Sequence, residues 1–146
     1  MPKRKDRKGK KKEIENVVTR GKRKSSIARA TISKGGGKVT INKRPHTLLP
    51  ELRKLTIEEP LRIAKDVLGG LDYDIKVNVK GGGQESRIEA SRLAIARALV
   101  EITGNKELEE EFTEYDRSLL VADTRRKEPY KPGVSKARKK RQKSYR

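Results

Sequence analysis

The hydrophobic and polar positions in the first third of the chain predict three short strands. Residues 13–19, EIENVVT, contain a β-branched run, and residues 27–32 follow with an imperfect but strand-like alternation. The stretch KGGGK at 34–38 favours a tight turn, because glycine accepts positive φ without steric cost. We therefore expect VTI at 39–41 to pair back on the preceding strand, so that the three strands form a meander.

A helix and a clearer strand are predicted next. Thr56 stands three residues before Glu59, which is the capping-box spacing, so a helix is expected to begin there and to end at residues 69–70, a glycine pair. Pro60 would then lie in the first turn, where its missing N–H matters least. Residues 73–80, YDIKVNVK, alternate apolar and polar side chains and form the cleanest strand pattern in the chain.

The remaining periodic segments are helical. The longest predicted helix covers about residues 85–103; it follows GGG at 81–83 and stops before Gly104. Asn105 is a good N-cap for an acidic helical segment that runs to about Ala122. The order β-β-β-α-β-α with a helical appendix predicts an α+β fold, a two-layer α/β sandwich.

Charge divides the chain into three parts. The net charge is +19, with 40% of residues charged and only 32% hydrophobic. Residues 1–12 carry +7 and residues 125–146 carry +10, which leaves +2 on residues 13–124. Runs of like charge with few apolar residues stay disordered on their own. We therefore predict a globular domain over 13–124, which we expect to bind RNA, a disordered basic N-terminal extension over 1–12, and an extended basic C-terminal tail over 125–146. From the charge alone the polyanionic partner is RNA, DNA or, as the weakest alternative, an anionic membrane.

Composition also excludes several kinds of chemistry. The chain has no cysteine, and a single histidine, His46, cannot form a His-cluster metal site or a His-paired triad. The acidic segment lacks the spacing of an EF-hand, and the triplet at 81–83 lacks the GK[ST] ending of a P-loop. We expect no catalytic residue, metal, cofactor or small-molecule substrate. No apolar stretch approaches the roughly 18 residues of a membrane span, so we expect a cytoplasmic protein without a membrane partner.

Three segments are candidates for nucleic-acid contact. Five cations lie between Arg20 and Arg29 with no acid among them; a solvated loop is the alternative. The glycine triplet directly precedes a helix. It is either a plain turn or a place where the helix N-terminus contacts an RNA phosphate. With only one phenylalanine and four tyrosines, the chain lacks an aromatic platform for bases, so binding should run through phosphates, sugars and RNA shape. The predicted RNA contacts are Arg20, Lys22, Arg23, Lys24, Arg29, Lys80, Gly81, Gly82, Gly83, Arg125, Arg126, Lys131, Lys136, Arg138, Lys139, Lys140 and Arg141.

Four stretches together resemble a known family. The segments GKRKSSIARATI, KVTINKRP, VKGGGQESRIEASRLAIARAL and YDRSLLVADTRRKEPYKPGVSKARKKRQKSYR are similar to the family of the ninth protein of the small ribosomal subunit. The similarity covers about residues 14–146 in order, and the KSYR ending resembles archaeal and eukaryotic members. Residues 1–12 do not belong to the shared pattern.

The resemblance implies a structural role without catalysis. It implies a left-handed βαβ crossover, against the usual rule. It also implies that the body binds small-subunit ribosomal RNA beside neighbouring ribosomal proteins of the subunit head, so that the protein is ribosome-bound. The tail would reach the anticodon stem-loop of the peptidyl-site tRNA. By this resemblance the tRNA contacts are Lys143, Ser144, Tyr145 and Arg146.

Two other functions remain open from the residues alone. The same positive charge would suit a nucleoid-type or chromatin-type protein that packs duplex DNA without needing a defined tail tip. A nucleotide-using enzyme is the third possibility, because related two-layer folds include kinases and the glycine triplet opens a helix. No base, nucleophile or metal cluster accompanies that triplet in the sequence.

Overall fold

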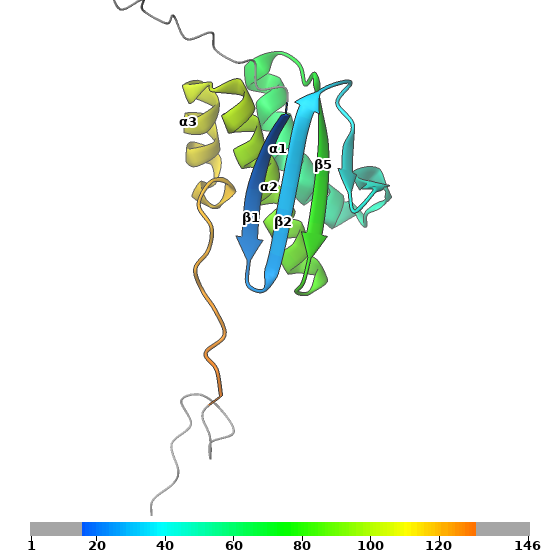
Figure 1. The fold of residues 1–146 in the computed structure, drawn as a ribbon. Coiled ribbons are helices and arrows are strands. Elements are labelled where there is room, and N and C mark those ends of the chain that lie inside the picture. Colours follow the sequence, from blue (N-terminus) through cyan, green and yellow to red (C-terminus); the bar gives the residue numbers. More distant parts are fainter. Residues whose placement is uncertain (1–15, 131–146) are drawn as a thin grey trace, which may run out of the picture.

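The computed structural model describes residues 16–130 and shows two layers, a five-stranded sheet with helices on one of its faces (Figure 1). This confirms the predicted α+β sandwich. Predicted positions of the strand at 73–80 and of the longest helix agree with the structure to within one residue. The elements in chain order are β1 (Asn16–Arg23), β2 (Ser26–Lys34), β3 (Val39–Ile41), β4 (Arg44–Pro45), the 3-10 turn η1 (His46–Leu48), α1 (Glu51–Leu68), β5 (Tyr73–Lys80), α2 (Gln84–Thr103), α3 (Lys106–Tyr115) and the 3-10 turn η2 (Arg117–Leu119).

The predicted meander is wrong, because β3 does not pair with β2. The sheet order is β1-β2-β5-β3-β4, so β5 inserts between them; β2 is antiparallel to β5 and β3 is parallel to it. The glycine-rich link between β2 and β3 is fastened to the start of β5. Gly35 N donates to the Asp72 carbonyl at 2.9 Å, and one carboxylate oxygen of Asp74 accepts from Gly36 N and Lys38 N at 3.0 Å. The link therefore bridges over β5, a long-range choice that local turn chemistry cannot reveal.

The connection from β3 through α1 to β5 is left-handed. In Figure 1 β5 runs downward, the helices lie behind the sheet, and β3 belongs on the side of β5 away from β2. The chain therefore descends in β3, rises behind the sheet in α1 and descends again one strand nearer to β2. This is the sense that the resemblance implied, opposite to the common rule.

The first helix begins earlier than its capping-box pattern predicted. α1 starts at Glu51 after Pro50, whose carbonyl already accepts from Lys54 N at 2.9 Å. Thr56 therefore lies inside the helix, where its hydroxyl donates to the Leu52 carbonyl at 2.9 Å instead of capping. Pro60 is buried in the helix interior. The end agrees with the prediction, since Gly69 takes the left-handed conformation there.

The end of the regular structure also differs in part from the prediction. Asn105 caps α3 as expected, accepting from Glu107 N at 3.0 Å. The helix stops at Tyr115, and Asp116 starts the short turn η2 by accepting from Ser118 N at 2.8 Å. The helical pattern up to Ala122 is thus broken by a second cap.

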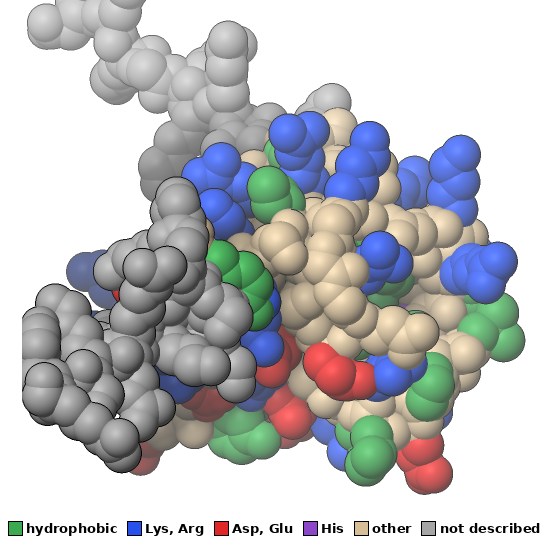
Figure 2. Space-filling view, turned by 90° about the horizontal axis from the view of Figure 1, so that it is seen from below, with side chains coloured by type: hydrophobic (Ala, Val, Ile, Leu, Met, Phe, Trp, Pro, Cys, Tyr) green, Lys and Arg blue, Asp and Glu red, His purple; other side chains and the backbone are tan. Residues whose placement is uncertain are grey.

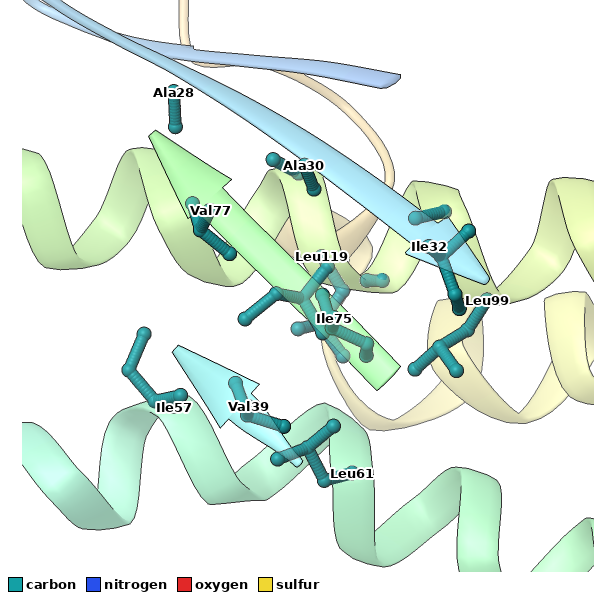
Figure 3. Close-up of a cluster of buried hydrophobic side chains, with 14 of the residues drawn as sticks. Ala28, Ala30, Ile32, Val39, Ile57, Leu61, Ile75, Val77, Leu99 and Leu119 are labelled. Atoms are coloured by element: carbon teal, nitrogen blue, oxygen red, sulfur yellow. The ribbon is translucent and has the colours of Figure 1, made fainter. Parts of the chain in front are cut away.

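The core lies between the sheet and the helices (Figure 3), and it brings α2 against β1 at unusually close range. Ile32, Ile75 and Leu99 are fully buried there. A Cβ on Gly21 would collide with the Ala90 carbonyl oxygen and lie 2.8 Å from the Ala94 nitrogen. The small residues of α2 thus let its backbone touch β1. This contact fixes which face of β1 points inward, and so which side chains point out.

Candidate nucleic-acid interface

The face of the sheet opposite the helices carries a cluster of cations. Side chains alternate between the two faces along each strand. Arg20 of β1 and Arg29 of β2 are opposite each other in the register and share the open face. Lys22 of β1 and Lys80 of β5 lie on either side of Ile27 of β2 on the same face. These residues and Lys76 are all exposed. We name this set, consisting of Arg20, Lys22, Arg29, Lys76 and Lys80, the sheet-face cluster.

None of the five cations has an acidic partner within residues 16–130. Asp74 is the acidic residue at an outward position of β1, β2 and β5. Its carboxylate already accepts hydrogen bonds from the two backbone amides of the glycine-rich link, Gly36 N and Lys38 N. Like charges directly opposite each other on neighbouring strands destabilise a sheet. An external polyanion would relieve this repulsion, so the face is chemically suited to a phosphate backbone.

The charge is concentrated on one side of the molecule. Seen from below in Figure 2, blue Lys and Arg side chains project along the upper edge, which is the open face of the sheet, while red acidic side chains lie lower in the view. The cluster contains four residues that the sequence predicted and one, Lys76, that was left out. The strict alternation of residues 73–80 already put Lys76 on the same face as Lys80, so this signal was sufficient to include it.

The glycine triplet lies beside the turn between β1 and β2. Gly81 and Gly82 have φ of 78° and 63°, and a Cβ on Gly81 would stand 2.6 Å from the Ser25 carbonyl oxygen. The buried Ser26 hydroxyl donates to the Gly81 carbonyl at 3.0 Å and lies 2.9 Å from the Ser86 hydroxyl. Packing and backbone conformation thus explain these glycines without a ligand. They place Lys80 and the exposed Lys24 at the same end of the sheet.

Arg23 differs from its basic neighbours. Its side chain is largely buried, and its guanidinium donates to Glu89 of α2 and to Asp123. The predicted contacts Arg125 and Arg126 also have intramolecular partners: Arg125 Nε donates to Asp123 at 2.9 Å, and Arg126 donates to the Asp123 carbonyl at 3.1 Å. The other tail candidates lie outside the described residues; they are Lys131, Lys136, Arg138, Lys139, Lys140, Arg141, Lys143, Ser144, Tyr145 and Arg146.

A second set of arginines holds the helices together. Arg92 of α2 forms ion pairs with Glu59 of α1 at 2.6 Å and with Asp116 at 2.9 Å. Burial works to raise the pKa of Asp116, but hydrogen bonds from Ser118 and Arg92 outweigh it and hold that pKa below its ordinary value. These ion pairs join the helices and so serve the fold, although Arg92 Nε and Glu59 Oε2 are buried without a hydrogen-bond partner among the described residues.

The remaining acidic and histidine candidates have structural partners or face solvent. The glutamates of α3 are exposed, as expected for a solvated helix face. His46 Nδ1 lies 3.2 Å from the Val39 carbonyl and Nε2 lies 3.7 Å from Glu58. A hydrogen bond from Arg62 is the main cause that lowers the pKa of Glu58. Over residues 16–130 no group of acidic or histidine side chains is arranged to hold a metal ion.

The same part of the chain contains no helix that is long and apolar enough to cross a membrane.

Comparison with known proteins points to one family. The model of the family described as Ribosomal protein S9/S16 matches residues 21–146. The chain is 50% identical over 133 residues to the small ribosomal subunit protein uS9 of Methanococcus vannielii, which covers 89% of this chain and 98% of the relative. The uS9 proteins of Methanococcus maripaludis strains C7 and C5 give the same identity and coverage.

Proposed function

The chain belongs to the ribosomal protein S9/S16 family and is a small-subunit ribosomal protein, and on this premise we propose that its open sheet face binds ribosomal RNA in the subunit head. The sheet-face cluster is the observation that carries the proposal, because five cations share one surface and lack acidic partners in the described part of the chain. The protein acts as a ribosome-bound structural component beside neighbouring head proteins and performs no catalysis.

Binding through this face uses charge and shape. Arg20 and Arg29 are adjacent across the strands, so two guanidiniums can grip neighbouring phosphate oxygens in fork geometry. Each phosphate that is neutralised releases condensed counterions, which favours binding and makes it sensitive to salt. The outward positions of β1, β2 and β5 over residues 16–34 and 74–80 hold no aromatic ring on which a base could stack. RNA backbone and groove shape are therefore the features recognised.

The test removes two cluster charges and compares them with two charges elsewhere. In R20Q/R29Q, the slope of log affinity against log salt for a small-subunit RNA fragment should flatten by about 1.5, because two phosphate contacts disappear. The control K65Q/K106Q removes the same charge from exposed positions on α1 and α3. Filter binding at several salt concentrations measures both, and duplex DNA as competitor separates an RNA-binding protein from a DNA-packing protein. Equal slopes for the two double variants would contradict the proposal.

We further propose that residues 125–146 reach the peptidyl-site tRNA. The support is the family membership and the composition of the segment, which holds eleven cations against one acid. Extended at about 3.3 Å per residue, 22 residues would span roughly 70 Å. Lys143 and Arg146 would contact the phosphates of the anticodon stem-loop, with Ser144 and Tyr145 between them. Residues 1–12 would add a second electrostatic contact with RNA.

Deleting Arg146 alone tests the tip. We expect weaker retention of tRNA on assembled subunits, by several-fold, because one charge-assisted contact is lost. Subunit assembly should stay normal, since the body is intact. Gradient sedimentation measures assembly and filter retention measures tRNA occupancy; K127Q, which removes a charge near the start of the tail, is the matched control. Unchanged tRNA occupancy after deletion would show that the tip has another role.

A further inference from the structure

The segment that follows α3 is fastened to the body at successive points, and we name residues 116–126 the tail root. Leu119 is fully buried in the core. The carbonyl of Leu120 accepts from Arg97 Nε at 2.9 Å, and Arg97 also donates to the Arg20 carbonyl of β1 at 3.0 Å. The tail root is thus joined to both α2 and β1 directly after η2, the last helical turn of the described residues.

Asp123 is the last of these attachment points. Its carboxylate accepts from Arg23 of β1, a residue 100 positions earlier in the chain, and both side chains are about four-fifths buried, with exposed fractions of 20% and 19%. Glu89 of α2 holds the other side of the Arg23 guanidinium. Arg23 therefore connects three elements: the β1 strand, the long helix and the tail root.

The same carboxylate also shapes the residues that come next. Asp123 accepts from Arg125 N at 2.7 Å and from Arg125 Nε at 2.9 Å, while its own carbonyl accepts from Arg126 at 3.1 Å. The backbone from 123 to 126 is therefore folded around the point where Arg23 attaches. From there residues up to 130 run past the end of β1 and away from the sheet (Figure 1). A charge pair thus fixes both the place and the direction of departure.

We propose that Arg23 is a positioning residue that aims the basic tail. The inference rests on the proposed function of the tail, which must bring its tip to a defined site. A tether that starts from a fixed point in a fixed direction samples less volume, so its tip is present at the target at a higher effective concentration. Pro129, with its restricted φ, favours extension after the root. Arg23, which has two acidic partners within residues 16–130, thereby has a use distinct from that of the sheet-face cluster.

The absence of cysteine from the whole sequence allows a direct measurement. Spin labels at E110C on the exposed face of α3 and at Y130C on the tail report their distance distribution by pulsed electron resonance. We expect R23Q to widen the distribution about twofold, because residues 123–130 lose their anchor and sample a coil. D123N should widen it to the same extent, and R23Q/D123N should add little, because all three variants break the same contact.

Two further variants separate positioning from general effects. K22Q removes a neighbouring charge that has no partner among the described residues, so its distribution should match the parent. R23K keeps the charge but can engage only one acid well, so its width should lie between those of the parent and R23Q. Thermal melting checks that the body of each variant stays folded. If R23Q unfolds at a lower temperature than the parent, the comparison uses D123N instead, because it breaks the same contact from the side of Asp123. A parent-like width in D123N, or equal widening in K22Q, would overturn the proposal.

The same variants distinguish this inference from the proposed tRNA contact. A wider distribution in R23Q together with normal tRNA retention after deletion of Arg146 would uphold the aiming role and reject the tRNA contact. Loss of tRNA retention after that deletion, with a parent-like distribution in both R23Q and D123N, would reject the aiming role and keep the tRNA contact.

Discussion

On the open face of the sheet, Arg20 and Arg29 lie opposite each other on neighbouring strands without an acidic partner in residues 16–130, whereas on the helix side Arg92 spans Glu59 and Asp116. The two regions use the same kind of side chain, on strands in one case and on a helix in the other. In one region every charge increases repulsion within the body, and in the other the charges join α1, α2 and η2. The difference separates residues that stabilise the fold from residues available to an external anion.

This difference also explains how a small body with little net charge can bind a polyanion. Over residues 13–124 the cations exceed the acids by only two. Within residues 16–124 most of the acids lie on the helices, so the open sheet face is left cationic although the body as a whole is nearly neutral. Distribution, more than total charge, determines where RNA can approach.

The largest expected effect concerns the contact that orients β1. Gly21→Ala should lower the free energy of unfolding by about 2–3 kcal/mol, because the added Cβ meets the backbone of α2 at Ala90 and Ala94, which cannot move aside without shifting the helix. Denaturant unfolding monitored by circular dichroism measures the loss. If β1 moved, Arg20 and Lys22 would also lose their outward register.

Gly36→Ala is the matched control for this substitution. Gly36 lies in the link between β2 and β3, and a Cβ there would have no atom within 4 Å. Its stability should stay within about 0.5 kcal/mol of the parent. Parent-like stability of Gly21→Ala would mean that α2 does not touch β1, and the division into an inner and an outer face of β1 would lose its basis.

Local patterns predicted the elements on which the cluster depends. The strict alternation of residues 73–80 gave the bounds of β5 and the outward direction of Lys76 and Lys80. The glycine triplet and Gly104 gave the two ends of α2 to within one residue. These features depend on near neighbours in the chain, which is why periodicity and capping were enough.

The sequence was a poorer guide where the outcome depends on distant partners. From its pattern β3 is the third strand of a meander. In the structure, however, the link before β3 is hydrogen-bonded to Asp72 and Asp74, and β3 lies on the far side of β5 from β2. Arg23 belongs to a run of five similar cations, and only the positions of Glu89 and Asp123, far along the chain, distinguish it. No local pattern contains that information.

A smaller effect is expected when the two kinds of arginine are removed in parallel. Arg92→Met should reduce the free energy of unfolding by about 1–2 kcal/mol, because Glu59 and Asp116 are left partly buried without their counter-charge. Arg29→Met should leave stability unchanged or raise it slightly, since it removes a like-charge neighbour of Arg20. The affinity for the RNA fragment should fall in Arg29→Met and change little in Arg92→Met.

Thermal unfolding and filter binding of the same two proteins measure both quantities. A destabilised Arg29→Met with intact RNA affinity would place Arg29 among the residues that support the fold. Conversely, a stable Arg92→Met with weakened RNA binding would mean that the helix-side ion pairs are not needed internally. Either result would remove the distinction between the two regions.

The smallest expected effect is a dependence of stability on acid pH to which two carboxyl groups on the helix side contribute. The pKa of Glu58 and that of Asp116 lie below their ordinary values of 4.5 and 3.8. A carboxyl group with a lowered pKa in the folded state contributes stability that is present above the ordinary value and lost as pH falls through the folded pKa. Part of the decline in Tm below about pH 4 should therefore come from these two groups.

Ser118→Ala tests the contribution of Asp116, because it removes the hydroxyl that donates to this carboxylate at 2.6 Å. The variant should be slightly less stable than the parent at pH 6, and the two Tm curves should converge as pH falls through the lowered pKa of folded Asp116, because the carboxyl then becomes protonated in both proteins. Ser25→Ala, at an exposed turn position, should follow the parent at every pH. Parallel curves for Ser118→Ala and the parent would show that Asp116 is not held as an anion. In that case the internal ion pairs on the helix side would contribute nothing to stability, and the helix-side charges would resemble those of the sheet-face cluster.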